Sequence, residues 1–179
     1  LVMIMYETIE IPYGSERRKV QVPKANLAWV TGPAHMDPVE DLRAALRSAI
    51  EKPIGAPRLE ELIARHGTKT LVIIDDGTRA TPQSQILPIL LNELNQAGVP
   101  DPDITIMVAL GTHRPLSHDE LVERVSREVF QRVQVENMSQ KPEDFVFLGV
   151  TPLGIPIHVS RKYMETPLTI AVGSIIPHM

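Results

Sequence analysis

The sequence predicts an α/β fold, with a parallel-rich sheet flanked by helices in an open, doubly wound arrangement and a small β segment at the N-terminus. Three observations support this prediction. The apolar runs at 70–74, 104–110 and 168–175 lack polar alternation, as expected of strands covered on both faces. Segments with helical spacing of apolar residues separate these runs. With 43% apolar residues among 179, the chain can also bury a sizeable core.

The first 30 residues read as β structure. Strands are predicted at 3–11, 19–22 and 25–30, because prolines and a glycine interrupt runs rich in β-branched and aromatic residues. This β appendage is expected to cover 1–30, and the α/β core is expected to cover 31–179.

Two helices are predicted before the first core strand. Asp37 and Pro38 are typical of an N-cap followed by proline at the first helical position, and the apolar residues of 39–49 follow helical spacing. A shorter helix is predicted at 59–65, with Gly67 as the residue that ends it.

From residue 70 onward, strands alternate with helices, which is typical of Rossmann-like folds. Thr81 and Pro82 are expected to open a helix that reaches Gln96. Ser117 and Glu120 match a capping box for the next helix. Further strands are predicted at 133–135, 145–148 and 155–159.

Composition excludes several classes of protein. The net charge is -4, and no block of Lys or Arg marks a nucleic-acid or membrane surface. Cysteine is absent, which excludes disulfides, thiolate metal sites and thiol nucleophiles. No apolar run reaches the length of about 18 residues that a membrane span requires, and the N-terminal residues lack the basic segment of a signal peptide. We therefore expect a soluble cytoplasmic protein that binds neither nucleic acid nor a membrane.

Each of the three most apolar strands runs into a short loop that carries glycine, a hydroxyl group and a chargeable side chain. The loops read DDGTRATP at 75–82, GTHR at 111–114 and GSIIPH at 173–178. In open parallel sheets, ligands bind outside the carboxyl ends of the strands. We therefore expect the three loops to converge on one crevice.

Several loop residues also have a structural interpretation. Asp75 and Asp76 could form the turn or cap the following helix, and Asp76 could pair with Arg79, three residues further on. Thr81 reads as an N-cap. Arg79, beside a helix N-terminus, suits an anion such as a phosphate or a carboxylate.

Histidines at two different strand ends suit acid–base chemistry. His113 and His178 could reach a bound molecule from opposite sides, and an ordinary histidine pKa of about 6.5 allows proton transfer in either direction at neutral pH. Each histidine alone could equally be a hydrogen-bonded loop residue. The sequence lacks the HExxH, GxSxG, GxGxxG and Walker patterns, so it does not indicate the enzymes that depend on them.

The motifs together resemble a known family. DDGTRATP, ALGTHRPLSHDE, LGVTPLGIPIHVSR and GSIIPH occur in the order seen in the lactate racemase family, the nickel-pincer 2-hydroxyacid racemases and epimerases. The stretch ALRSAIEKPIGAPRLEEL also resembles the segment that precedes the D-x-T-R strand of the family. The resemblance covers nearly the whole chain. It implies that 1–179 is the single N-terminal catalytic domain of a larger two-domain protein whose C-terminal domain is absent from this sequence.

The resemblance also implies roles for individual residues. His113 and His178 would be the paired catalytic histidines, and Arg79 would hold the substrate carboxylate. The cofactor, a nickel-pincer nucleotide, would contact Asp76, Thr78, Gly111 and Thr112. The implied reaction is a proton-coupled hydride transfer, in which one histidine removes the hydroxyl proton while the α-hydride moves to the pyridinium ring of the cofactor. The flat ketoacid then takes the hydride back on its other face.

The chain departs from the family pattern at two places. In the family, a lysine that tethers the cofactor and a histidine that ligates nickel follow the PH motif, and this sequence stops before them. No metal ligand is therefore expected within 1–179, and this fragment alone is expected to be inactive. An NHD motif common in relatives reads Asn137-Met138-Ser139 here. The 2-hydroxyacid substrate and the oligomeric state, which could be a homo-oligomer, stay open.

Two other functions are compatible with the residues. A non-catalytic module of the same fold could bind a phosphorylated or carboxylated small molecule, although anion binding requires no pair of histidines. A hydrolase or lyase could use Asp76 and His113, but the sequence has neither a nucleophile elbow nor metal-ligand spacing.

Overall fold

The computed structural model describes residues 3–14, 16–32 and 37–176. The chain forms two compact units, Leu1–Pro38 and Val39–Met179. The boundary between the units thus lies after residue 38, beyond the predicted end of the β appendage at residue 30. Within the described ranges, no helix is long and apolar enough to cross a membrane.

The N-terminal unit contains an antiparallel hairpin of β1 (Tyr6–Tyr13) and β2 (Glu16–Pro23), which confirms the first two predicted strands. The strand predicted at 25–30 is wrong, because Lys24–Asn26 is a 3-10 helix and the following residues are irregular. No strand in the described part of the chain pairs with 25–30, so the backbone hydrogen bonds that a strand needs are not available there.

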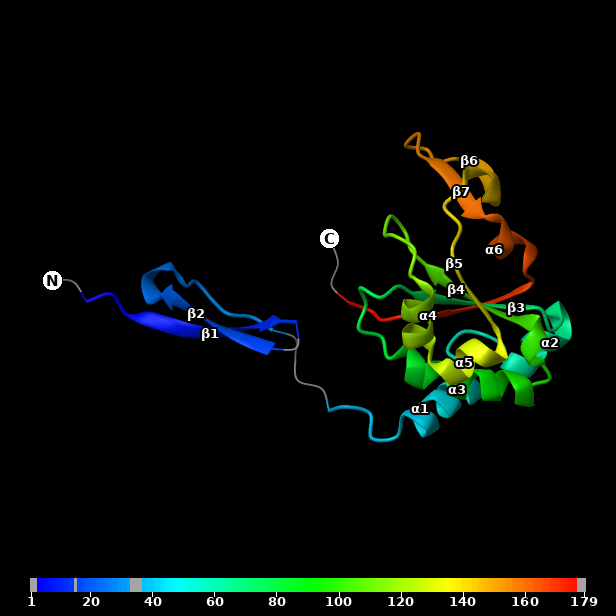
Figure 1. Cartoon of the computed structure of the whole chain (residues 1–179), viewed down its shortest axis with the longest axis horizontal. Coiled ribbons are helices and arrows are strands. Elements are labelled where there is room, and N and C mark those ends of the chain that lie inside the picture. The colour runs from blue at the N-terminus through cyan, green and yellow to red at the C-terminus, as the bar shows by residue number, and fades with distance from the viewer. Residues whose placement is uncertain (1–2, 15, 33–36, 177–179) are drawn as a thin grey trace. The chain divides into compact units, whose positions relative to one another are not determined.

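The second unit is built around four parallel strands in the order β5-β4-β3-β8 (Figure 1). Their bounds are Thr70–Asp75 for β3, Ile104–Ala109 for β4, Gln134–Asn137 for β5 and Leu168–Val172 for β8. The register places Ile74 of β3 beside Val108 of β4 and Val172 of β8. This sheet confirms the predicted parallel-rich α/β fold. The last strand ends at Val172, before the predicted end at residue 175.

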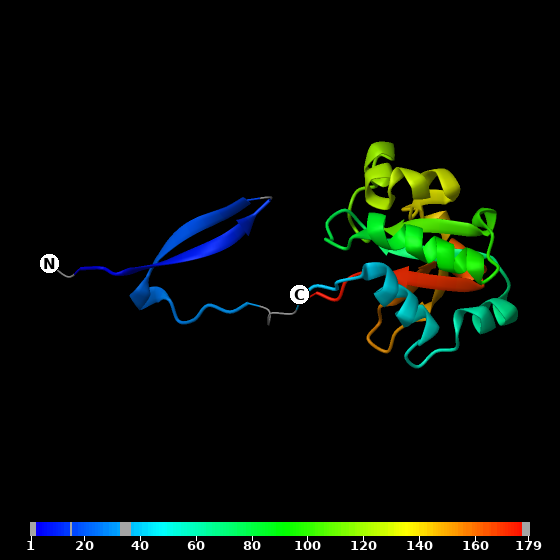
Figure 2. The ribbon, with the colours of Figure 1, turned by 90° about the horizontal axis from the view of Figure 1, so that it is seen from below.

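Helices cover one face of this sheet. They are α3 (Gln83–Gln96), α4 (His118–Val125) and α5 (Arg127–Arg132), and α3 and α5 lie below the strands in Figure 1. In Figure 2, α3 crosses the front of this unit. The core lies between these helices and the sheet, where burial of apolar side chains supplies most of the driving force for folding. Its fully buried side chains include Leu87, Leu91, Leu94, Val72, Ile106 and Val108.

The connection from β5 to β8 passes the opposite face of the sheet (Figure 1). It contains an antiparallel hairpin of β6 (Phe145–Val150) and β7 (Pro156–Ser160), followed by α6 (Arg161–Glu165). β4 and β8 lie on either side of β3, so right-handed crossovers to them must pass on opposite faces of the sheet. Such an arrangement is a doubly wound sheet.

Two helices precede the sheet, α1 (Leu42–Glu51) and α2 (Leu59–His66). The predicted start of α1 at Asp37 and Pro38 is wrong. Asp41 is the N-cap, because its carboxylate accepts a hydrogen bond from the backbone N–H of Ala44 (3.0 Å), and Val39 is exposed instead of joining the apolar face. Gly67, with φ 86, ends α2 as predicted.

Local signals at the other helix ends were partly correct. The capping box of Ser117 and Glu120 is present at the start of α4. Thr81 is not the N-cap of α3, since Pro82 occupies that position and no side chain caps the helix. The sequence did not predict α5 and α6, because helices of 6 and 5 residues are too short to display a helical period.

Candidate functional site

The carboxyl ends of β3, β4 and β8 lie at the same edge of the sheet, because the three strands are parallel neighbours. The three strand ends therefore lie together, but the expectation that all three loops share one crevice is confirmed only for the loops after β3 and β4, because no described residue of the loop after β8 lines the cavity. The strand order reverses between β3 and β8, which is the topological switch point of the sheet, and the cavity lies at the same edge on the β3–β4 side. His178 lies outside the described residues, and the loop after β8 is described only as far as Ile176.

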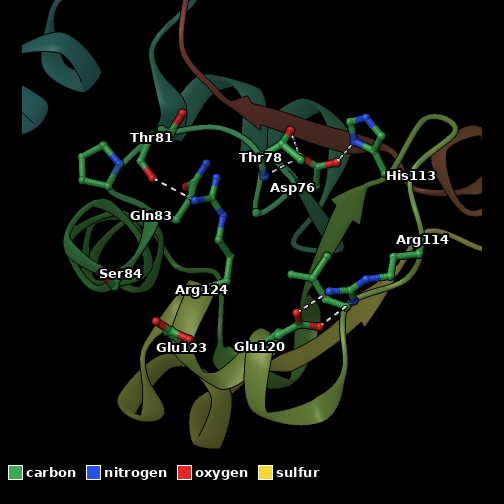
Figure 3. Close-up of a pocket in the computed structure, with 13 residues that line it drawn as sticks. Asp76, Thr78, Thr81, Gln83, Ser84, His113, Arg114, Glu120, Glu123 and Arg124 are labelled. Atoms are coloured by element: carbon green, nitrogen blue, oxygen red, sulfur yellow. Dashed lines mark hydrogen bonds and ion pairs between the residues drawn. The ribbon is translucent and has the colours of Figure 1, made fainter. Parts of the chain in front are cut away.

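A cavity of about 500 Å³ opens at this edge (Figure 3). Its wall is formed by the loops that follow β3 and β4, the start of α3 and one side of α4. It includes Asp76, Thr78, Gln83, Ser84, His113 and Arg124. The volume lies within the range of about 300 to 1,000 Å³ that small-molecule sites occupy.

Asp76 is buried, with 5% of its surface exposed, and both of its carboxylate oxygens have partners within the chain. One oxygen accepts hydrogen bonds from the backbone N–H of Thr78 (2.9 Å) and from its hydroxyl group (2.6 Å). The other oxygen is hydrogen-bonded to Nδ1 of His113 (Figure 3). The alternative pairing of Asp76 with Arg79 is not formed, because Arg79 offers only its backbone N–H, to the carbonyl of Asp76 (3.2 Å).

The surroundings of Asp76 favour its charged form. Burial by itself raises the pKa of this carboxyl, but the hydrogen bonds from Thr78 and His113 outweigh that effect and lower the pKa to about 2. Asp76 is therefore an anion at neutral pH. The imidazole of His113 beside it is half exposed, at 51% of the side chain, so its outer edge is accessible from the cavity.

The backbone of His113 is held from both sides. Its N–H donates to the carbonyl of Leu110 (2.9 Å), which closes a tight turn after β4, and its carbonyl accepts from the side-chain amide of Gln140 (2.9 Å). Gly111 enters this turn with φ 56. No atom lies within 4 Å of the position that a Cβ would take, so the backbone conformation, not crowding, requires glycine here.

A second group of polar side chains fixes the loop between β3 and α3. The carboxylate of Asp75 accepts hydrogen bonds from the Thr81 hydroxyl, the Gln83 amide (2.9 Å) and the guanidinium of Arg124. Arg124 also donates to the backbone carbonyls of Asp75 (3.2 Å), Arg79 (3.0 Å) and Thr81 (3.2 Å). Asp75 therefore has the structural role that was one of its two interpretations.

The same group of side chains is tied to the end of β8. The amide of Gln83 donates to the carbonyl of Val172 (2.9 Å), and the hydroxyls of Thr81 and Ser174 are hydrogen-bonded at 2.5 Å. Sequence reasoning missed Arg124, which lies 49 positions from Asp75. The only signal in the sequence was the pair of adjacent aspartates, because Arg79 was the single cation considered as a partner for them and a second cation could therefore be sought elsewhere in the chain.

Three of the predicted site residues, Arg79, Gly111 and Thr112, lie outside the cavity wall. Arg79 is half-buried, and within the described ranges its guanidinium has no hydrogen-bond or ion-pair partner, which leaves it available to an anion. The described residues also contain no group of three or more His, Asp or Glu side chains that could hold a metal ion.

Comparison with known proteins points to one family. The model of the lactate racemase N-terminal domain matches residues 13–179. The chain is 31% identical over 173 residues to the lactate racemase of Lactiplantibacillus plantarum, and 29% identical over 176 residues to that of Thermoanaerobacterium thermosaccharolyticum. Each match covers 95% of this chain and 40% of the relative. The chain thus spans well under half the length of these curated relatives.

Solved structures share the fold. The lactate racemase apoprotein from T. thermosaccharolyticum matches with a TM-score of 0.71 and 25% identity, over 92% of this chain and 38% of that chain. A protein from Thermotoga maritima matches with a TM-score of 0.51 and 23% identity, over 69% of this chain and 31% of that chain, which concerns the fold alone. The family model, the relatives and the fold agree, and this chain belongs to the lactate racemase family, of which it represents the N-terminal domain.

Proposed function

We propose that this chain is the N-terminal catalytic part of a nickel-pincer-dependent racemase or epimerase that inverts a 2-hydroxyacid. One observation carries the proposal: His113 is held by the buried Asp76 at the wall of a cavity at the carboxyl edge of the sheet. Membership of the lactate racemase family supports a racemase-related role. The proposal adds the substrate class, the cofactor and the two histidine bases.

The residues of the cavity fit a nucleotide cofactor. The N-terminus of α3, a helix of 14 residues, has no side-chain cap, and Ser84 in its first turn lines the cavity. A helix N-terminus can bind phosphate through its backbone N–H groups and the positive end of its dipole. The backbone N–H groups of Gln83 and Gln85 already donate to the carbonyls of Thr81 and Pro82, so among the first three residues of α3 the backbone N–H of Ser84 is the one left for a ligand within the described ranges.

We infer that Thr78, Ser84 and Asp76 hold the nickel-pincer nucleotide at the cavity wall, and that Gly111 and Thr112, which lie outside that wall in the adjacent turn, contact it as well. When bound, this cofactor supplies the acceptor for the hydride that leaves the substrate α-carbon.

The side chains of this chain then bind the substrate and move its proton. Arg79 binds the substrate carboxylate, since a guanidinium offers two parallel N–H groups to it. His113 takes the proton of the hydroxyl group: the O–H bond breaks, an N–H bond forms, and the C–O bond becomes a carbonyl as the α-hydrogen departs with its electron pair. The product of this half-reaction is a planar 2-ketoacid. With the cofactor bound, the hydride would return to the other face of the ketoacid and His178 would deliver a proton to oxygen, which would give the opposite enantiomer.

The proposal extends to the rest of the longer protein. Because this chain spans 40% of the curated relatives, we infer that a C-terminal domain completes the site and supplies the nickel ligand. Residues 1–179 alone are then expected to show no racemisation.

The proposed function is tested on the longer protein. Nickel content and cofactor mass are measured, and the interconversion of enantiomers is followed for lactate, malate and larger 2-hydroxyacids. The His113→Asn variant should lose at least about 100-fold in rate, because general acid–base groups contribute about 10²- to 10⁴-fold. The matched control is His66→Asn, since His66 is exposed at the end of α2 and precedes β3, away from the carboxyl ends of the strands.

Near-wild-type racemisation by His113→Asn would refute the role of His113 as a base. Binding of a phosphorylated or carboxylated molecule, without racemisation of any of the hydroxyacids, would instead support the non-catalytic binding module.

A further inference from the structure

The carboxylate of Asp76 receives hydrogen bonds from two directions. Thr78 donates its backbone N–H and its hydroxyl to Oδ1, and His113 approaches Oδ2 with Nδ1 (Figure 3). Both donors of Thr78 are only two residues from Asp76 along the chain, so they fix the orientation of the carboxylate through a local turn. The orientation of Asp76 therefore does not depend on His113.

The charge of Asp76 decides which ring nitrogen of His113 carries the proton. An ionised carboxylate has acceptors only, so the hydrogen bond to it requires a proton on the facing nitrogen. Hydrogen bonds from Thr78 and His113 outweigh the effect of burial and lower the pKa of Asp76 to about 2, which keeps it ionised throughout the neutral range. In neutral His113 the single N–H must then lie on Nδ1.

We propose that Asp76 is a positioning residue, which locks His113 in the tautomer protonated on Nδ1 and leaves the lone pair of Nε2 as the atom that exchanges a proton with a molecule bound in the cavity. The turn with Leu110 and the hydrogen bond from Gln140 hold the backbone of His113 in place, so Asp76 controls the remaining freedom of the side chain, its ring orientation and tautomer.

A second Asp–His pair in the chain provides an internal contrast. His118 lies 3.2 Å from the carboxylate of its neighbour Asp119, but both side chains are largely exposed, at 72% and 101%. An exposed pair competes with water and contributes little energy. The pair of His113 with Asp76 differs because the carboxylate is buried and anchored by Thr78. A fixed tautomer is therefore expected at His113 and not at His118.

The catalytic consequence of this tautomer rests on the proposed function. When the substrate O–H bond breaks, the proton forms the N–H bond at Nε2, and the imidazolium that results lies against the anionic Asp76. The carboxylate stabilises this cation without taking a proton itself, as the aspartate of a serine-protease triad does. With the opposite tautomer, Nε2 would already carry a hydrogen atom and could not accept the hydroxyl proton.

The tautomer can be measured without any catalysis, in the 179-residue chain labelled with ¹⁵N-histidine. Long-range ¹⁵N–¹H correlation spectra, recorded well above the ordinary histidine pKa of about 6.5, distinguish a nitrogen that bears hydrogen from one that does not. Comparison with His113→Asn assigns the signals. We expect Nδ1–H at His113 and averaged nitrogen signals at His118. A proton on Nε2 of His113 in the wild-type chain would overturn the proposal.

The Asp76→Asn variant preserves volume and tests the cause. The two donors of Thr78 require an acceptor, so they hold the amide oxygen of the new residue on their side and direct its NH₂ group at His113. Nδ1 must then accept, and the tautomer should invert to Nε2–H. The amide fingerprint spectrum verifies that the fold is kept. A variant that retained Nδ1–H on His113 would show that Asp76 does not set the tautomer.

The same variant in the longer protein connects the tautomer to racemisation. By analogy with the loss on the corresponding amide substitution in a serine-protease triad, we expect kcat to fall by about 10²- to 10⁴-fold, with KM nearly unchanged. An inverted tautomer with unaltered kcat would refute the role of Nε2. If the longer protein racemises no 2-hydroxyacid while the spectra agree with expectation, the proposed function fails and the positioning of His113 by Asp76 stands.

Discussion

Replacing Arg124 with methionine removes the guanidinium that holds the loop between β3 and α3. The Arg124 side chain is 12% exposed and that of Asp75 is 18% exposed, so the ion pair between them is largely shielded from water. Methionine keeps the aliphatic part of the side chain. It removes the charge and the donors that reach the carbonyls of Asp75, Arg79 and Thr81.

The size of the effect follows from these contacts. Breaking a buried ion pair by removing one partner lowers stability by about 3 to 5 kcal/mol. Asp75 keeps hydrogen bonds from Thr81 and Gln83, and the cavity gives water access to part of the loop, which places the expected loss at the lower end. We predict that Arg124→Met lowers the free energy of unfolding by about 3 kcal/mol, a large part of the about 5 to 15 kcal/mol of a typical domain.

Urea unfolding followed by circular dichroism measures this loss. With an m-value of about 2 kcal/mol per molar urea, the midpoint should fall by about 1.5 M. The control is Arg65→Met, which removes an exposed pair with Glu61 (61% and 54% exposed) and should shift the midpoint by about 0.2 M, as expected for a pair worth about 0.3 to 0.5 kcal/mol. If both variants unfold at the same urea concentration, the structural role given to Arg124 is wrong.

Three further predictions concern the same loops. Thr78→Val removes a hydroxyl donor, so the pKa of Asp76 should rise from about 2 toward 3.8 in a ¹³C NMR titration of its carboxyl group, and an unchanged pKa would contradict the assigned hydrogen bond. The folded state lowers the pKa of Asp76 from 3.8 to about 2, and each pKa unit corresponds to about 1.4 kcal/mol. Ionised Asp76 should therefore contribute about 2 kcal/mol to the free energy of unfolding above a pH of about 4. This contribution should disappear as the pH falls toward 2. The stability difference between the wild type and Asp76→Asn should therefore shrink over that interval, and a constant difference would argue against the shift. Gly111→Ala should lower the unfolding free energy by about 1 to 2 kcal/mol, because a side chain is strained at φ 56. Gly77→Ala should have a much smaller effect, because φ is not positive there and the space around it is also open. Equal effects of the two substitutions would indicate that the turn does not require the left-handed conformation.

The sequence was sufficient for the parallel sheet. The runs at 70–74 and 104–110 are apolar at successive positions, as is typical of strands in a covered parallel sheet, and both are core strands in the structure. The capping box of Ser117 and Glu120 also gave the start of α4 correctly. The capping box depends on residues that are close in the sequence. The core strands depend on burial of both faces, which a short run of consecutive apolar residues indicates.

Features that depend on distant partners could not be predicted. Thr81 has the sequence context of an N-cap, but its hydroxyl is hydrogen-bonded to Asp75 and Ser174, which competes with the capping role. Asp76 and His113 are 37 positions apart, so the sequence could place both at one edge of the sheet without revealing their hydrogen bond. The strand expected at 25–30 failed for a related reason, because strand formation depends on a pairing edge that no local pattern reveals.

The proposed chemistry separates the two hydrogens of the substrate: His113 and His178 exchange the hydroxyl proton with solvent, while the α-hydrogen moves as a hydride and never becomes acidic. Racemisation of a 2-hydroxyacid carrying deuterium at the α-carbon, in ordinary water, tests this separation directly. Mass spectrometry of the inverted enantiomer should find the deuterium retained. Its replacement by solvent hydrogen during inversion would mean that the histidines remove the α-hydrogen as a proton, and would contradict the account.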